Sequence, residues 1–116
     1  YFIHHPDGEL LHAAGLTAAR KGEGDAWDVS FTVITREARD AGGEVHDRMP
    51  TFLTEDAIEE WLSPGKLEAD QKAPLLAQLE DVSSTIAEQL VTRPVDRQVN
   101  NVRGLDRSDP SLIEEV

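Results

Sequence analysis

The segment from Trp27 to Val33 alternates apolar and polar side chains without a break. Its odd-numbered positions hold tryptophan, valine, phenylalanine and valine, and aspartate, serine and threonine separate them. Side chains of a strand point alternately to its two faces, so this pattern predicts a β-strand with one apolar face. We expect the strand to continue through Ile34 and Thr35, and we expect Trp27 to lie in the core.

A second pair of strands is predicted at the start of the chain. Pro6-Asp7-Gly8 is a turn signal, because proline restricts φ and glycine accepts a positive φ. It separates two segments with strand character, residues 1–5 and 9–15, which predicts a β-hairpin.

Helices are predicted mainly in the second half of the chain. Thr54 is a suitable helix cap, and the proline and glycine of Ser63-Pro64-Gly65 end that helix. Pro74 suits the first position of a second helix. The remaining expectations are a helical turn at 36–40, an extended segment at 86–95, an irregular stretch at 99–102 and a short helix after Ser108-Asp109-Pro110. Strands followed by helices favour an α+β fold of antiparallel strands with several short helices.

The composition limits the classes of protein. The 116 residues suffice for one small domain, and no apolar run approaches the roughly 18 residues of a membrane span. There is no cysteine, which excludes disulfides, thiolate metal sites and a cysteine nucleophile within these residues. With 23 acidic and 11 basic residues the net charge is −12, opposite to what nonspecific DNA binding requires.

Two expectations concern the context of the chain. It begins with strand-like residues rather than methionine, so we expect these residues to be the C-terminal part of a larger single domain. The 116 residues include no basic-then-apolar leader and no cysteine, which favours a cytoplasmic protein.

The candidate functional loop is His46-Asp47-Arg48-Met49-Pro50. It follows the strand and a glycine pair and precedes a capped helix, where a scaffold often presents functional side chains. An imidazole exchanges protons near neutral pH, and a guanidinium can pair with a phosphate. The alternative is a surface histidine and a local ion pair between Arg48 and Asp47 or Glu44, which contributes little.

Other candidate sites are weaker. His4 and His5 are adjacent on an expected strand and point to opposite faces, so they cannot chelate one metal ion together, although His12 could approach one of them. No metal site or cofactor is predicted. Trp27 and Trp61 could stack on bases, but both keep period with apolar neighbours, which favours the core.

Several segments together resemble the SOS response-associated peptidase (SRAP) family. The closest are residues 30–35 (SFTVIT) and 45–50 (VHDRMP), which match a strand ending in threonine followed by the family's His-x-Arg-Met-Pro loop. Trp61-Leu62 resembles the downstream tryptophan–leucine pair, and residues 94–95 and 99–101 resemble the family's late segments. Residues 13–16 resemble an Ala-Gly-Leu strand, but Thr17 replaces the usual aromatic residue after it.

The resemblance implies a repair protein that senses abasic sites in single-stranded DNA. Family members use an N-terminal cysteine, whose amine and thiol trap the abasic aldehyde as a thiazolidine; an asparagine, a glutamate and a histidine assist. The histidine matches His46, and the other three residues are expected upstream of Tyr1. The resemblance further implies that Arg48 contacts a phosphate beside the lesion, that Thr35 bonds His46 or a phosphate, and that Met49 and Pro50 shape the wall near the lesion. The family's peptidase name refers to removal of residues ahead of the cysteine.

Two alternatives remain open. The net charge of −12 and the missing nucleophile are compatible with a catalytically silent, acidic binding or assembly module. A hydrolase that uses His46 with Asp47 has less support, because no nucleophile is evident. Unpaired strand edges also predict self-association of the chain.

Overall fold

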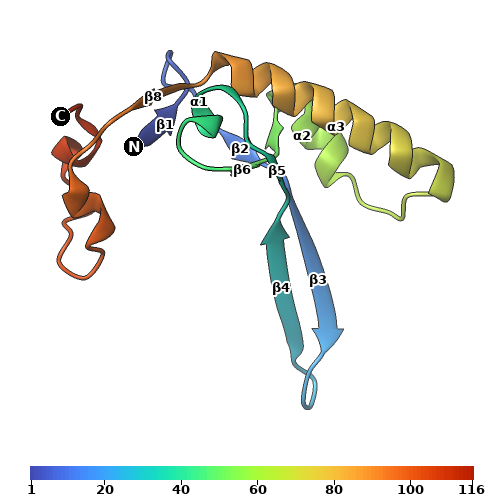
Figure 1. Cartoon of the computed structure of the whole chain (residues 1–116). Coiled ribbons are helices and arrows are strands. Elements are labelled where there is room, and N and C mark those ends of the chain that lie inside the picture. The colour runs from blue at the N-terminus through green and yellow to red at the C-terminus, as the bar shows by residue number, and fades with distance from the viewer.

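The structure, a computed structural model, describes residues 1–116 and has the predicted α+β architecture (Figure 1). A long helix, α3 (Ala69–Gln89), crosses a set of short antiparallel strand pairs. The pairs are β1 (Phe2–His4) with β8 (Val91–Arg93), β2 (His12–Ala13) with β7 (Phe52–Leu53), β3 (Gly15–Lys21) with β4 (Trp27–Val33), and β5 (Thr35–Glu37) with β6 (Arg48–Pro50). The other helices are α1 (Asp40–Gly43), α2 (Glu55–Leu62) and the 3₁₀ turns η1 (Arg97–Asn100) and η2 (Pro110–Ile113). None of these helices combines the length and apolar character that crossing a membrane requires.

Three of the four strand pairs, β2–β7, β3–β4 and β5–β6, meet at a junction of three backbone segments. Ala14 N–H donates to Thr51 O at 2.8 Å, Thr51 N–H donates to Ile34 O at 2.8 Å, and Ile34 N–H donates to Ala14 O at 2.9 Å. Ala14 and Thr51 are almost completely buried, so these bonds are shielded from water. The junction joins the root of the β3–β4 hairpin to the strands that carry the candidate loop.

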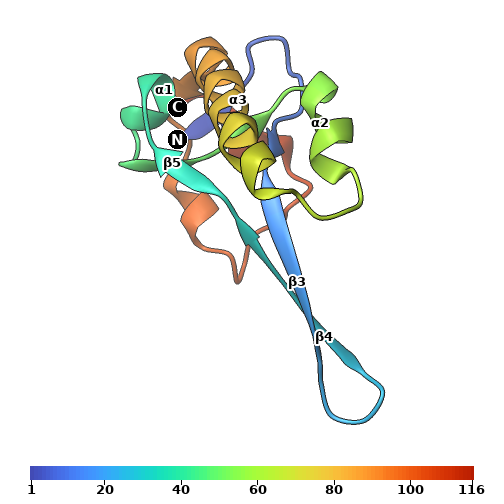
Figure 2. The same cartoon turned by 90° about the vertical axis from the view of Figure 1, so that its right-hand side faces the viewer.

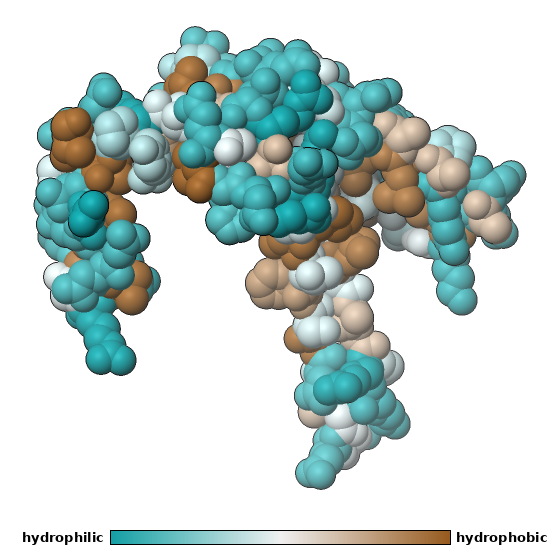
Figure 3. All heavy atoms as spheres, in the orientation of Figure 1, coloured by the Kyte–Doolittle hydropathy of each residue, from teal (hydrophilic) through white to brown (hydrophobic).

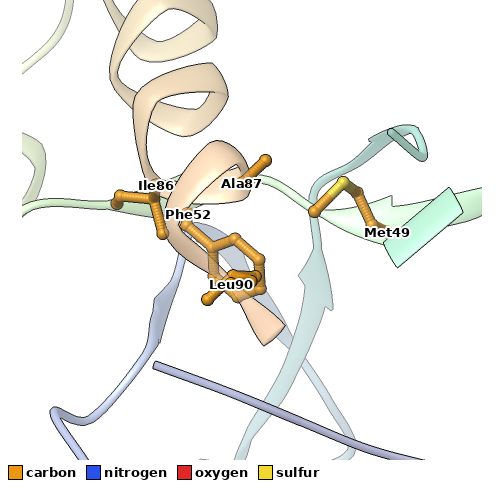
Figure 4. Packing of buried hydrophobic residues seen from close by; sticks show 5 residues of the cluster. All are labelled: Met49, Phe52, Ile86, Ala87 and Leu90. Carbon is orange, nitrogen blue, oxygen red and sulfur yellow. The ribbon is translucent and has the colours of Figure 1, made fainter. Parts of the chain in front are cut away.

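The core lies between α3 and the β6–β7 segment. Met49, Phe52, Ile86, Ala87 and Leu90 form one buried cluster, in which the C-terminal turns of α3 face the Phe52 ring (Figure 4). In addition, Phe52 N–H donates to the Ser83 Oγ at 3.0 Å. Tertiary contacts therefore attach α3 to the segment that directly follows the candidate loop.

The strand predicted from Trp27 to Val33 is confirmed as β4, but its expected environment is wrong for Trp27. β3 and β4 form a hairpin that projects from the body of the molecule (Figures 1 and 2). Hydrophobic residues cover its root and hydrophilic residues cover its tip (Figure 3). Trp27 is 64% exposed and Phe31 80% exposed, because nothing within these residues packs on the apolar face of the ribbon. The alternation identified the strand, but it could not show whether a partner covers that face.

The hairpin predicted at the start of the chain is also wrong. The turn itself is present, since Gly8 N–H donates to His5 O at 3.0 Å and Gly8 has a φ of 75°. The strands on its two sides do not pair with each other, because β1 pairs with β8 and β2 pairs with β7. Pairing with strands distant in the sequence is thus favoured over pairing of these two segments with each other across the turn.

The helix boundaries require three corrections. α3 begins at Ala69 rather than at Pro74, and the Glu68 N–H donates to the Gln71 side chain at 2.9 Å at its start. α3 also continues to Gln89, so the extended segment predicted from position 86 begins only at β8. The helical turn predicted at 36–40 is wrong, because β5 pairs with β6 there and α1 follows it. The predicted helix after Thr54 and the short helical turn after Asp109 are confirmed.

Candidate functional site

The candidate loop closes an antiparallel strand pair. β5 and β6 are in register at Thr35 with Pro50, Arg36 with Met49 and Glu37 with Arg48. Paired residues of an antiparallel ladder share a face. Thr35 and Arg48 therefore lie on one face of the ladder, while Arg36 and Met49 lie on the face that is turned toward α3.

Arg48 is exposed and is held by Thr35. Its Nη2 donates to the Thr35 Oγ1 at 2.9 Å, a diagonal contact across the strand pair. The two other arginines of this region already bind carboxylates: Arg36 pairs with Glu80 at 2.6 Å, and Arg39 pairs with Asp40 at 2.9 Å. Arg48 has no carboxylate oxygen within 4.0 Å, so its charge remains available for an external anion such as a phosphate.

His46 lies at the turn before β6, with 68% of its side chain exposed. The polar contacts of its side chain all involve Nδ1, which lies 2.9 Å from the Arg48 backbone N, 3.2 Å from Arg48 O and 2.9 Å from an Asp47 carboxylate oxygen. The first contact requires an unprotonated Nδ1, and the last requires a protonated one. The loop therefore offers a partner to Nδ1 in either protonation state and leaves Nε2 without a protein partner.

Backbone bonds hold the turn that presents His46. His46 N–H donates to Gly42 O at 3.0 Å, and Ala38 N–H donates to Asp47 O at 2.9 Å. A Cβ on Gly42 would lie 3.3 Å from the Met49 Cε, which is closer than ordinary van der Waals contact. Gly42 therefore allows α1 to lie tightly against the buried side of β6.

Met49 and Pro50 differ from Arg48 in exposure. Met49 is 5% exposed and belongs to the core cluster, so it supports the ladder from beneath. Pro50 is half-buried, on the same face as Thr35 and Arg48. The roles predicted for both residues at a lesion stay predictions.

The other sequence candidates lie apart from this loop. His5 and His12 line one hollow of about 560 Å³, while the His4 ring stacks on Phe2 with centroids 5.0 Å apart. No group of three histidine, cysteine, aspartate or glutamate side chains lies close enough to bind a metal ion. Trp61 is half-buried and donates from its Nε1 to Gly15 O at 3.1 Å, which attaches α2 to the start of β3.

The sequence did not identify the residues that attach the ladder to α3. Arg36 Nη1 donates to Glu80 O at 3.2 Å and to the Ser84 Oγ at 2.9 Å. Arg39 Nη2 lies 3.4 Å from a Glu88 carboxylate oxygen of α3. A related long-range contact lies outside α3: the Thr92 hydroxyl of β8 lies 3.3 Å from a carboxylate oxygen of Glu44, the residue after α1. These partners are separated by more than 40 residues in the sequence, so no local pattern signals them.

Comparison with known proteins agrees with the family resemblance. A family model described as SOS response associated peptidase (SRAP) matches residues 1–102. The chain is 26% identical, over 103 residues, to a curated Escherichia coli protein named abasic site processing protein YedK, a match that covers 89% of this chain and 44% of that protein.

A solved structure has a similar fold. A crystal structure of a Bacteroides thetaiotaomicron protein superposes with a TM-score of 0.64 at 18% identity, covering 98% of this chain and 47% of that one. The chain thus spans less than half the length of both relatives. Because the SRAP model matches most of its residues, including the His46–Pro50 loop, the chain belongs to the SOS response associated peptidase (SRAP) family.

Proposed function

We propose that this chain takes part in the processing of abasic sites in single-stranded DNA, with His46 as the proton-transfer group and Arg48 as a phosphate contact. The proposal rests on one observation above the others. The loop presents an imidazole with a free Nε2 beside an arginine that has no ion-pair partner. Family membership and the name of the Escherichia coli relative direct the choice of substrate.

His46 is suited to moving a proton at Nε2. When Nδ1 is protonated, the Asp47 carboxylate or Arg48 O accepts its hydrogen, and Nε2 has a lone pair that acts as a base. When Nδ1 is unprotonated, it accepts from the Arg48 N–H, and Nε2 bears the proton. Both tautomers thus have a partner, as a group that alternates between acid and base requires.

The covalent reaction that we propose is the thiazolidine formation that the family resemblance implies. The C1′–O4′ bond of the abasic sugar breaks, O4′ gains a proton, and an amine attacks the aldehyde carbon with loss of one water. A thiol sulfur then adds to the resulting imine carbon, and its proton moves to nitrogen, which gives a thiazolidine. The sequence contains no cysteine, so both nucleophiles come from outside these residues, and His46 supplies or accepts protons.

Arg48 contributes to DNA affinity rather than to proton transfer in this proposal. Each phosphate contact to single-stranded DNA adds roughly 0.7 to the slope of log K against log salt. We expect Arg48→Gln to lower that slope by about this amount and to weaken binding of all sequences alike. Arg103→Gln is the matched control, since it removes the same charge at an exposed position distant from the loop in the sequence.

The test of the chemistry uses the 116-residue chain with free cysteine as the external aminothiol. Single-stranded DNA with one abasic site is incubated with cysteine, and thiazolidine formation is followed by mass spectrometry with and without protein. We expect saturable acceleration, which His46→Gln reduces at least tenfold, within the lower range of general acid–base effects. His4→Gln, in β1, is the control. Acceleration that does not depend on His46 would contradict the assigned role.

A second function is favoured by the net charge of −12. An acidic surface can serve in binding or assembly without catalysis. The autoproteolysis that the family resemblance implies would likewise require the cysteine that these residues lack. This alternative predicts weak DNA binding with a shallow salt dependence. Binding that weakens steeply with salt, together with a loss on Arg48→Gln, favours the abasic-site function.

A further inference from the structure

Arg36 lies on the buried face of β5, the strand that pairs with β6 and carries Thr35 on its other face. Only 12% of its side chain is exposed, and its guanidinium contacts a single turn of α3. Nη2 pairs with the Glu80 carboxylate at 2.6 Å, while Nη1 donates to Glu80 O at 3.2 Å and to the Ser84 Oγ at 2.9 Å. Three contacts from one planar group determine both the distance and the orientation of β5 relative to α3.

The residue before Arg36 points the other way and holds Arg48. Successive side chains of a strand alternate between faces, so Thr35 faces the exposed side when Arg36 faces α3. The Thr35 hydroxyl accepts from Arg48 Nη2 at 2.9 Å. The same turn of α3 binds the next strand segment, because the Ser83 Oγ accepts from Phe52 N–H at 3.0 Å. α3 thus holds β5 and the segment after β6 at fixed positions.

We propose that Arg36 is a positioning residue for the DNA-contacting arginine: it fixes β5 against α3, and Thr35 then fixes the Arg48 guanidinium. The part of the proposal that concerns DNA rests on the proposed function, whereas the part that concerns Arg48 order does not. An ion pair that served stability alone would affect unfolding without changing the mobility of Arg48. The two possibilities therefore differ in a property that can be measured.

The first experiment measures the mobility of Arg48 in the free protein. Its Nε–Hε resonance, assigned by its loss in Arg48→Lys, gives an order parameter from ¹⁵N relaxation. We expect Arg36→Gln to lower this value to below about 0.6, the range of flexible groups. Thr35→Val should lower it equally. Arg36→Lys keeps a charge for Glu80 but not the planar fork, so it should give an intermediate value.

Two further variants control for charge and folding. Arg39→Gln removes a nearby charge and the longer contact with Glu88 of α3, but it leaves every contact of Arg36 intact, so the order of Arg48 should not change. Ser84→Ala removes one of the three contacts and leaves the rest of the side chain in place, so it tests the proposal if Arg36→Gln does not fold. An Arg48 order parameter that stays unchanged in both Arg36→Gln and Ser84→Ala overturns the proposal.

The second experiment measures affinity for single-stranded DNA that carries a stable abasic analogue. We expect Arg36→Gln to weaken binding about threefold in the wild-type background and less than twofold in Arg48→Gln, because contacting residues in one network are not additive. Equal weakening in both backgrounds contradicts an action through Arg48. If Arg48 loses order but the wild-type chain binds no DNA, the positioning role stands and the proposed function fails.

Discussion

The contact between Ser83 and Phe52 permits a stability prediction with a matched control. Ser83→Ala removes one atom, the Oγ that accepts the Phe52 N–H at 3.0 Å. Ser83 is fully buried and Phe52 is 7% exposed, so water cannot replace the lost acceptor. A buried donor without a partner costs about 1–3 kcal/mol. Alanine in a helix returns up to about 0.5 kcal/mol. We therefore expect the free energy of unfolding to fall by about 0.5–2.5 kcal/mol by this balance.

Ser84→Ala is the control, because it makes the same change one residue later in α3. The Ser84 Oγ accepts from Arg36, which keeps its two contacts to Glu80. The gain in helix propensity is the same, so the expected loss is no more than about 1 kcal/mol. Urea unfolding followed by circular dichroism measures both variants. If the losses of unfolding free energy for Ser83→Ala and Ser84→Ala lie within about 0.5 kcal/mol of each other, the Phe52 N–H does not depend on the Ser83 hydroxyl as its acceptor.

Three further predictions concern the core, the exposed β3–β4 hairpin and the turn that begins at Asp106. Met49→Ala should lower the free energy of unfolding by about 2–5 kcal/mol, because Met49 is 5% exposed within the main cluster. Urea unfolding measures this loss, and a loss below about 1 kcal/mol would show that the cluster repacks around the smaller side chain. We expect the chain to self-associate through the apolar face of β4. Association should be stronger at high salt, because each copy has a charge of −12 and salt screens the repulsion. Phe31→Ser should reduce the self-association seen in sizing chromatography, and a wild-type chain that is monomeric at every concentration contradicts the prediction. Hydrogen bonds from the Ser108 hydroxyl and backbone N–H lower the pKa of Asp106 below its ordinary value of 3.8, so their contribution to stability is present above that value and is lost as the pH falls through the lower folded pKa. Ser108→Ala should raise the titration midpoint of Asp106 toward 3.8 in an NMR titration, and an unchanged midpoint would assign the shift to another group.

Local patterns predicted the elements that need no distant partner. The alternation from Trp27 to Val33 predicted β4. Thr54 correctly marked the N-cap position of α2, although its side chain makes no capping hydrogen bond. The placement of residues 46–50 after the long strand and before α2 also followed from local signals, but Arg48–Pro50 form strand β6 rather than part of a loop. The span matched by the family model contains these residues. The predictions that failed concern strand pairing, as in the expected hairpin before Gly15, helix bounds, as at Pro74, and burial, as at Trp27.

The sequence alone determined the fold class, the family and the residue types of the candidate loop. Those properties depend on local periodicity, turn residues and a short ordered motif, all of which are encoded within a few neighbouring positions. The tertiary structure decided that Arg48 is free to bind an anion whereas Arg36 is buried against α3. Both arginines belong to the β5–β6 ladder, but they lie on opposite faces of it. A turn of α3, more than 40 residues away from Arg36 in the sequence, covers only the face on which Arg36 lies. Long-range packing makes that choice, because the free energy of pairing a charge depends on which partners the fold brings to it.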